Sequence, residues 1–147
     1  MDVNRNAPVV AADEIEIAAS HESVWDVLTD LESWPRWNPD VKSMSVQDGL
    51  APGSVFRWKA GPGTITSTIQ EVEPPLRLAW TGTTFGIKAR HVYRLEPRGE
   101  ATLVHTEESY EGLVARALRR SLQKTLEKAL TDGLRHLKTE AEGRRAA

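Results

Sequence analysis

Residues 112–142 read GLVARALRRSLQKTLEKALTDGLRHLKTEAE, and this stretch decides the fold. Its leucines recur at intervals of three and four residues, which places them along one stripe of an α-helix. These leucines are Leu118, Leu122, Leu126, Leu130, Leu134 and Leu137. At 1.5 Å per residue, one unbroken helix over this range would be about 46 Å long. We predict such a helix because no other segment could cover the strands that precede it.

The segment from Val41 to Ser109 alternates apolar and polar residues between turn signals, a pattern typical of antiparallel strands. The turn signals are Asp48-Gly49, Pro52-Gly53, Gly61-Pro62-Gly63, Pro74-Pro75, Gly82 and Arg98-Gly99. They predict about six strands in a meander. An earlier strand is predicted where Ile15 and Ile17 alternate with glutamates.

A first helix is predicted from about His21 to Leu31, because Ser20 is a favourable N-cap and Glu22 follows in the first turn. The next residues, Trp34-Pro35-Arg36-Trp37-Asn38-Pro39, contain too much proline to extend this helix by more than a turn. The order of elements predicts an α+β fold in which one long helix lies across one curved sheet. Such an arrangement leaves a hollow between helix and sheet.

A chain of 147 residues fits one domain. We expect the domain at residues 13–142, with flexible ends at 1–12 and 143–147. The net charge of −2 gives no general attraction for nucleic acid. No apolar run is long enough for a signal peptide or a membrane span, so a cytoplasmic protein without stable membrane insertion is expected. The expected partner is a small hydrophobic molecule, bound by a monomer or a homodimer.

Metal and cofactor sites are not expected. The chain has no cysteine, which excludes disulfides and thiolate ligands. The histidines are dispersed along the sequence, at His21, His91, His105 and His136. They do not suggest a zinc site. There is also no GxGxxG, P-loop or GxSxG pattern.

Strand phase decides which polar residues face the hollow. Between Ile87 and Leu95 the inward set is predicted to be Ile87, Ala89, His91, Tyr93 and Leu95. If Arg98-Gly99 is a two-residue hairpin turn, paired residue numbers sum to 197, so His91 faces Thr106 and Glu108 points inward nearby. A three-residue loop or a bulge would instead bring Glu107 inward.

Four stretches resemble the START and birch-pollen-allergen superfamily (SRPBCC), and within it the polyketide cyclase/dehydrase-like group. They are IEIAASHESVWDVLTDLESWPRWNPDV (15–41), GSVFRWKAG (53–61), IQEVEPPLRLAW (69–80) and HVYRLEPRGEATLVHTEESYEGL (91–113). The resemblance covers about Glu14 to Leu137. It implies a helix-grip fold, in which a seven-stranded antiparallel sheet wraps around the C-terminal helix and encloses a hydrophobic cavity. Members of the superfamily include ligand carriers, receptors and aromatase/cyclases, so the resemblance leaves the reaction open.

Aromatic side chains are expected to form the walls of this cavity. Flat aromatic walls suit planar hydrophobic ligands, although each such residue fits an ordinary core equally well. Trp34 is expected to be a core residue and Trp37 a ligand contact. The full set of predicted ligand-binding residues is Trp37, Phe56, Trp58, Ile69, Trp80, Ile87, His91, Tyr93, Thr106, Leu118, Leu122 and Leu126.

Two functions remain open. The first is a binding protein for a hydrophobic, aromatic or polyketide-like molecule. The second is a cofactor-independent cyclase or dehydratase with His91 as general base, oriented by Glu108, and with Tyr93 as a hydrogen-bond donor. A buried structural network is the simpler interpretation of these three residues, so binding is preferred.

Basic residues on the final helix, Arg116, Arg119, Arg120, Lys124 and Lys128, are interrupted by Glu127, Asp132, Glu140 and Glu142. This mixture favours a solvated face over a surface for anionic lipid or nucleic acid.

Overall fold

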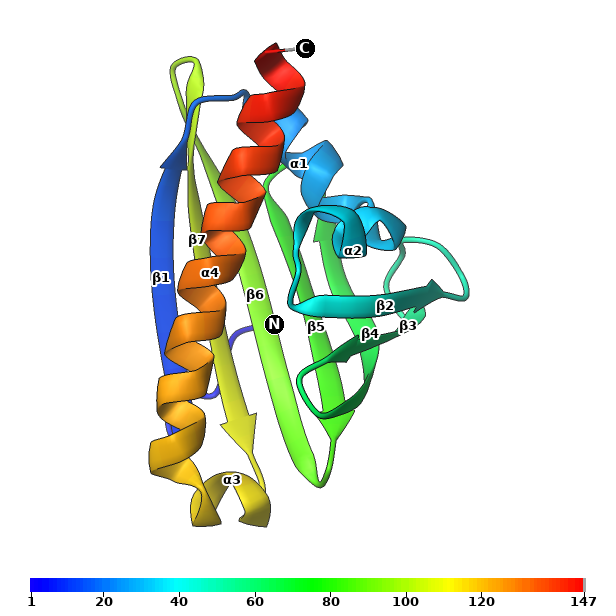
Figure 1. Ribbon diagram of the computed structural model, residues 1–147, viewed down its shortest axis with the longest axis vertical. Helices are drawn as coiled ribbons and strands as arrows, with labels where there is room; N and C mark the ends of the chain where they lie inside the picture. Colours follow the sequence, from blue (N-terminus) through cyan, green and yellow to red (C-terminus); the bar gives the residue numbers. More distant parts are fainter. Residues whose placement is uncertain (147) are drawn as a thin grey trace.

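Seven strands form one antiparallel sheet in the order β1-β7-β6-β5-β4-β3-β2 (Figure 1). The computed structural model describes residues 1–146, with side chains to Arg144. The strands are β1 (Val9–Ile17), β2 (Val41–Val46), β3 (Val55–Ala60), β4 (Gly63–Glu73), β5 (Arg77–Thr84), β6 (Ile87–Arg98) and β7 (Ala101–Glu111). Strands β2 to β7 pair with their sequence neighbours, and β1 pairs with β7. The predicted strand followed by a six-stranded meander is confirmed.

The first helix, α1 (His21–Thr29), begins where the capping signal predicts. The Ser20 hydroxyl accepts a hydrogen bond from the backbone N–H of Ser23 and so satisfies a free donor of the first turn. A 3₁₀ turn, η1 (Leu31–Ser33), and a single turn of helix, α2 (Trp34–Trp37), follow. The proline-containing segment therefore extends the helix by no more than a turn, as predicted.

The final helix is not one unbroken rod. It consists of α3 (Leu113–Ala117) and α4 (Arg119–Ala146), with Leu118 between them at φ −109° and ψ 24°, outside helical geometry. The chain changes direction here, between the end of β7 and the long helix (Figure 1). The leucine spacing did not reveal this corner because the apolar stripe continues through it. The backbone N–H groups of Leu118 and Leu122 still donate to the carbonyls of Val114 and Leu118, as in a helix. The prediction of a single helix from Gly112 to Glu142 was wrong at Leu118.

Regular secondary structure extends past the expected domain boundaries at both ends of the chain. Strand β1 starts at Val9, four residues before the expected boundary. Ahead of it, Val3 is buried against Ala79 and Val92 on the outer face of the sheet. At the other end α4 continues to Ala146, while residue 147 of the expected flexible tail lies outside the described residues.

Helix α4 packs along β1, at one edge of the sheet (Figure 1). Its N-terminal half buries Leu126 and Leu130 against Val9 and Ala11 of β1. Its C-terminal half contributes Leu134, Leu137 and Ala141 to the main core, together with α1. The leucine stripe therefore holds the helix on the sheet as predicted, except at Leu118, which is 52% exposed.

The register of the β6–β7 hairpin differs from the prediction by two residues. Arg98 pairs with Ala101, so the turn is Gly99-Glu100, and paired numbers sum to 199. His91 consequently lies opposite Glu108, and Tyr93 lies opposite Thr106. A shift of two residues preserves the face on which each side chain lies. The inward position of Glu108 is thus correct although its predicted partner was not.

Candidate functional site

An aromatic cluster fills the inner face of the sheet where α2 crosses it. Trp34 is its centre, with ring centroids 5.5 Å from Trp58, 5.6 Å from Trp80, 6.2 Å from Phe56 and 6.4 Å from Trp37. Most of these pairs meet edge to face, a favourable geometry for aromatic quadrupoles. The proline-rich α2 turn is what brings Trp34 over the strands, and Trp34 is the core residue that the sequence predicts.

Not every indole N–H in this cluster has a hydrogen-bond partner among the described residues. Trp34 Nε1 donates to the carbonyl of Leu28 at 2.9 Å, and Trp58 Nε1 donates to Ser67 Oγ at 3.0 Å. Trp37 Nε1 is buried and has no hydrogen-bond partner among the described residues. A buried donor without a partner is costly in free energy, so this N–H is available to a polar atom of a ligand.

Next to the aromatic cluster, β6 and β7 present a polar group. His91 is buried, and its Nε2 lies 2.7 Å from Thr106 Oγ1. Its Nδ1 lies 3.3 Å from Glu108 Oε1, within ion-pair distance, yet the geometry gives Nδ1 no hydrogen bond. The His91 ring also packs against Trp80 at 4.6 Å and stacks on Tyr93 at 4.8 Å. The predicted trio of His91, Tyr93 and Glu108 is therefore assembled on one wall.

Burial sets the protonation of this group. It lowers the pKa of His91 to about 3 and raises that of Glu108 to about 8, because an apolar environment disfavours a charged side chain. Burial also raises the pKa of Tyr93 to about 12, with a smaller contribution from the charge of Glu108. At neutral pH the group is uncharged: a neutral imidazole, a protonated carboxyl and a phenol. Such a set can donate and accept hydrogen bonds without carrying a buried charge.

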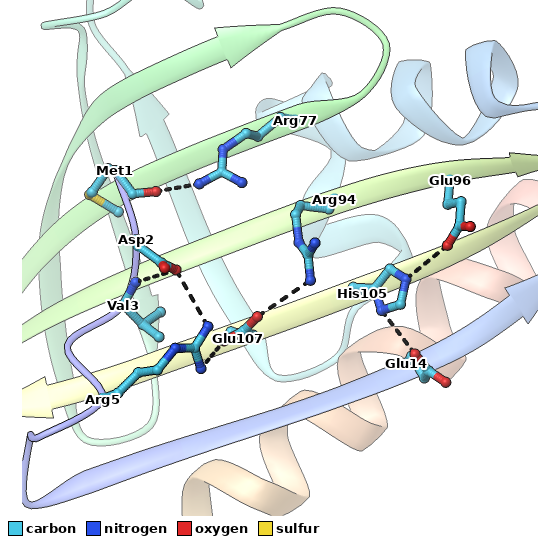
Figure 2. A network of polar contacts seen from close by, with 10 residues as sticks. All are labelled: Met1, Asp2, Val3, Arg5, Glu14, Arg77, Arg94, Glu96, His105 and Glu107. Carbon is cyan, nitrogen blue, oxygen red and sulfur yellow. Dashed lines mark hydrogen bonds and ion pairs between the residues drawn. The ribbon is translucent and has the colours of Figure 1, made fainter.

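The outer face carries a separate charged network (Figure 2). His105 lies between Glu14 at 2.8 Å and Glu96 at 3.2 Å, and Glu107 pairs with Arg5 at 2.9 Å and Arg94 at 3.5 Å. Both residues point away from the aromatic cluster, as strand phase predicts. The alternative in which Glu107 replaces Glu108 on the inner face is therefore wrong.

The other predicted ligand-binding residues differ in their surroundings. Phe56, Ile69 and Trp80 are buried in the core, Trp37 and Trp58 are half-buried beside it, and Ile87 is half-buried at the start of β6. Leu126 is packed against β1, with Leu122 half-buried next to it. Leu118 is on the surface at the corner between α3 and α4.

Two residues of the inner wall were missed by the sequence analysis. Tyr110 follows Glu108 by two positions on the same face of β7, and the charge of Glu108, with burial, raises its pKa. Strand alternation alone would have identified it. Ser67 is buried and fixes the Trp58 indole, and no sequence signal marked that contact.

Two hollows occur elsewhere on the described surface. One of about 350 Å³ lies on the outer face and is lined by Met1, Asp2, Arg5, Arg77, Arg94 and Glu107. Another of about 170 Å³ lies between the end of α1, η1 and the β2–β3 loop, and includes Leu31, Val46 and Leu50. Neither is lined by the predicted ligand-binding residues. Trp34 and the neighbouring aromatic rings occupy part of the space expected between helix and sheet.

Within residues 1–146, no group of three or more histidine, aspartate and glutamate side chains is arranged to hold a metal ion. Over the same residues, no helix has the length and apolar character needed to cross a membrane.

Comparisons with known proteins agree with this architecture. Residues 8–142 match the family described as polyketide cyclase / dehydrase and lipid transport. No curated protein sequence matches the chain. The hypothetical protein jhp0584 from Helicobacter pylori has a similar structure, with a TM-score of 0.83 and 18% identity over 95% of this chain and 91% of that one.

Two further structures share the fold. The Zhui aromatase/cyclase from Streptomyces sp. R1128 has a TM-score of 0.81 and 17% identity, over 94% of this chain and 95% of that one. A START superfamily protein from Mycobacterium smegmatis has a TM-score of 0.77 and 18% identity, over 91% of this chain and 97% of that one. At these identities the structures show a common fold. The family match covers nearly the whole sequence, and the chain belongs to the polyketide cyclase / dehydrase and lipid transport family.

Proposed function

We propose that the inner face binds a small hydrophobic molecule that is planar or aromatic and carries at least one polar atom. The observation that carries this proposal is a pair of buried ring nitrogens, Trp37 Nε1 and His91 Nδ1, that have no hydrogen-bond partner among residues 1–146. Buried polar atoms in folded proteins nearly always have a partner, so these two positions favour a bound polar group.

The surroundings of these nitrogens favour a flat ligand. Trp80 stacks on Tyr93 with an angle of 27° between the rings, and Tyr93 stacks on His91 at 23°, while Trp80 and His91 are tilted by 48° to each other. Flat aromatic side chains of this kind bind planar molecules with little loss of conformational freedom. Trp58 and Tyr93 are half-buried. Small side-chain movements there would admit a ligand, as occurs in many complexes.

Calorimetric titration with 2-naphthol and with naphthalene tests the proposal. The two probes share a ring system and differ in one hydroxyl, so the difference in affinity measures the polar contact. We expect 2-naphthol to bind at micromolar concentration, near −8 kcal/mol, and naphthalene more weakly. Trp37→Phe should reduce this difference, whereas Trp25→Phe, a matched change on α1, should preserve it. Absence of heat with both probes, or equal affinities, would contradict the proposal.

A second candidate function is acid–base catalysis of a cyclase or dehydratase type. The observation that favours it is the 3.3 Å separation of His91 Nδ1 and Glu108 Oε1 in a buried, uncharged pair. If the tautomer of His91 donates from Nε2 to Thr106, Nδ1 carries the lone pair that could accept a substrate proton, and the lowered pKa of the buried imidazole makes it a weaker base than a histidine in water. The Tyr93 hydroxyl, whose ring stacks on His91, is then a candidate donor for a developing enolate oxygen.

His91→Gln separates catalysis from binding. If His91 is the base, turnover of a poly-β-ketone substrate should fall at least about a hundredfold in this variant, a larger loss than one missing hydrogen bond to a ligand would cause. His105→Gln is the matched control, because His105 lies on the outer face. If the variants His91→Gln and His105→Gln turn over substrate at the same rate as the wild-type protein, the catalytic candidate fails and the binding function stands.

A further inference from the structure

Three large apolar side chains are exposed at one end of the molecule. Phe85 is 66% exposed, Leu113 82% and Leu118 52%. They lie at the β5–β6 hairpin tip and around α3, the end opposite the C terminus (Figure 1). The hairpin and α3 touch: a side chain added at Gly86 would lie 3.6 Å from Val114. We call Phe85, Leu113 and Leu118, with the cations described below, the tip surface.

The backbone at Phe85 is unusual for an exposed phenylalanine. Phe85 has φ 47° and Gly86 has φ 75°, and both lie in the two-residue turn between the paired residues Thr84 and Ile87. Turns of this kind favour Asn-Gly, and a bulky residue in the left-handed region is strained. The ring lies over Gly63 but remains mostly exposed. A strained, exposed aromatic residue points to a contact outside the fold.

Four cations lie in the same segment as Leu113 and Leu118. Between Gly112 and Leu126 the chain has Arg116, Arg119, Arg120 and Lys124 and no acidic residue. All four are exposed, and within residues 1–144 none of them pairs with a carboxylate within 4.0 Å. The ion pairs of α4 begin only at Lys128 and Asp132. The acidic residues that made this helix look like a mixed solvated face all lie beyond Leu126, so they do not neutralise the tip.

We propose that the tip surface docks reversibly on an anionic membrane. Apolar side chains flanked by unpaired Arg and Lys are the combination that inserts into the headgroup region of anionic lipid. The three apolar residues come from separate turns and line neither surface hollow, which suits a fluid lipid surface better than a groove on a protein partner. Because no described helix can span a bilayer, the association is peripheral. This inference does not depend on the proposed ligand or on catalysis.

Vesicle flotation tests the proposal with the full chain. Vesicles of phosphatidylcholine containing about one third phosphatidylserine should bind the protein, vesicles of phosphatidylcholine alone should bind it weakly, and binding should fall as salt rises. The double variant Arg119→Gln/Arg120→Gln should lower the partition coefficient roughly 30-fold, the loss expected for two cations near anionic lipid. Leu113→Ser should also reduce binding.

Matched controls lie away from the tip. Arg36→Gln/Lys42→Gln removes two exposed cations near α2, and Leu76→Ser changes an exposed leucine at the other end of β5. Both should bind vesicles like the wild-type protein. The proposal is overturned if anionic vesicles are not bound, or if the tip variants bind as well as the controls. Binding of a soluble acidic protein such as an acyl carrier protein, with no vesicle binding, would also overturn it. Affinity for 2-naphthol, measured in the same variants, shows independently whether the ligand site is intact.

Discussion

His91 and Glu108 lie directly opposite each other on β6 and β7, with Nδ1 and Oε1 3.3 Å apart in a buried site. Burial moves their pKa values in opposite directions, below the ordinary value for His91 and above it for Glu108. The pair therefore holds one proton over a wide pH range. Its effect on stability depends on how many protons the unfolded chain holds at the same pH.

The free energy of unfolding should have a plateau between about pH 4.5 and 6.5. In the unfolded chain Glu108 titrates near 4.5 and His91 near 6.5, and in the folded protein they titrate near 8 and 3. Below the plateau the unfolded state binds an extra proton, so stability rises with pH from about 3. Above it the folded state holds the extra proton, so stability falls by about 2 kcal/mol up to pH 8. Urea denaturation across this range measures the profile.

Glu108→Gln is the control for that profile. It removes the proton that the folded state retains, so the fall between pH 6.5 and 8 should disappear while the rise at low pH, which comes from His91, remains. A variant whose stability still falls between pH 6.5 and 8 like that of the wild type would show that the slope originates elsewhere.

Leu126→Ala should cost the full amount for a buried leucine, about 2 to 5 kcal/mol. Leu126 is 1% exposed and packs against Val9, Ala11 and Leu130. Leu118→Ala, the same change at an exposed corner, should cost less than about 0.5 kcal/mol. Chemical denaturation of both variants checks this. Equal costs would mean that α4 does not pack on β1 as described.

Trp34→Ala should be among the most destabilising single changes, at about 3 to 5 kcal/mol. It deletes the centre of the aromatic cluster and leaves the carbonyl of Leu28 without its indole donor. Trp37→Ala should cost clearly less, because Trp37 is half-buried and its N–H forms no bond in the fold. Thermal unfolding of the two variants compares them, and a reversed order would contradict the assigned roles.

Much of the fold could be predicted from periodicity. Alternation at two residues and leucine spacing at three and four residues gave the seven strands and the long helix, since these periods follow from backbone geometry. The break at Leu118 could not be predicted, because the apolar stripe continues through it. The β6–β7 register was wrong by two residues because Gly99-Glu100, and not Arg98-Gly99, forms the turn.

For the candidate site, the sheet face on which each residue lies could also be predicted. Strand phase gave the face of His91, Tyr93 and Glu108, and a two-residue error in register left that face unchanged. Packing was not predictable. Trp34 lies against Trp58 of β3 and Trp80 of β5, and a contact between residues so far apart in the chain does not follow from the periodicity of either segment.

A small hydrophobic molecule bound on the inner face would lie beside Trp37, Trp58, Trp80 and His91. Nuclear magnetic resonance of the tryptophan indole N–H groups during titration with 2-naphthol detects such a ligand at each ring. We expect a large shift for Trp37, whose Nε1 has no partner within the described chain, smaller shifts for Trp58 and Trp80, and none for Trp25 on α1. Unchanged indole resonances at saturating 2-naphthol, or a shift confined to Trp25, would contradict it.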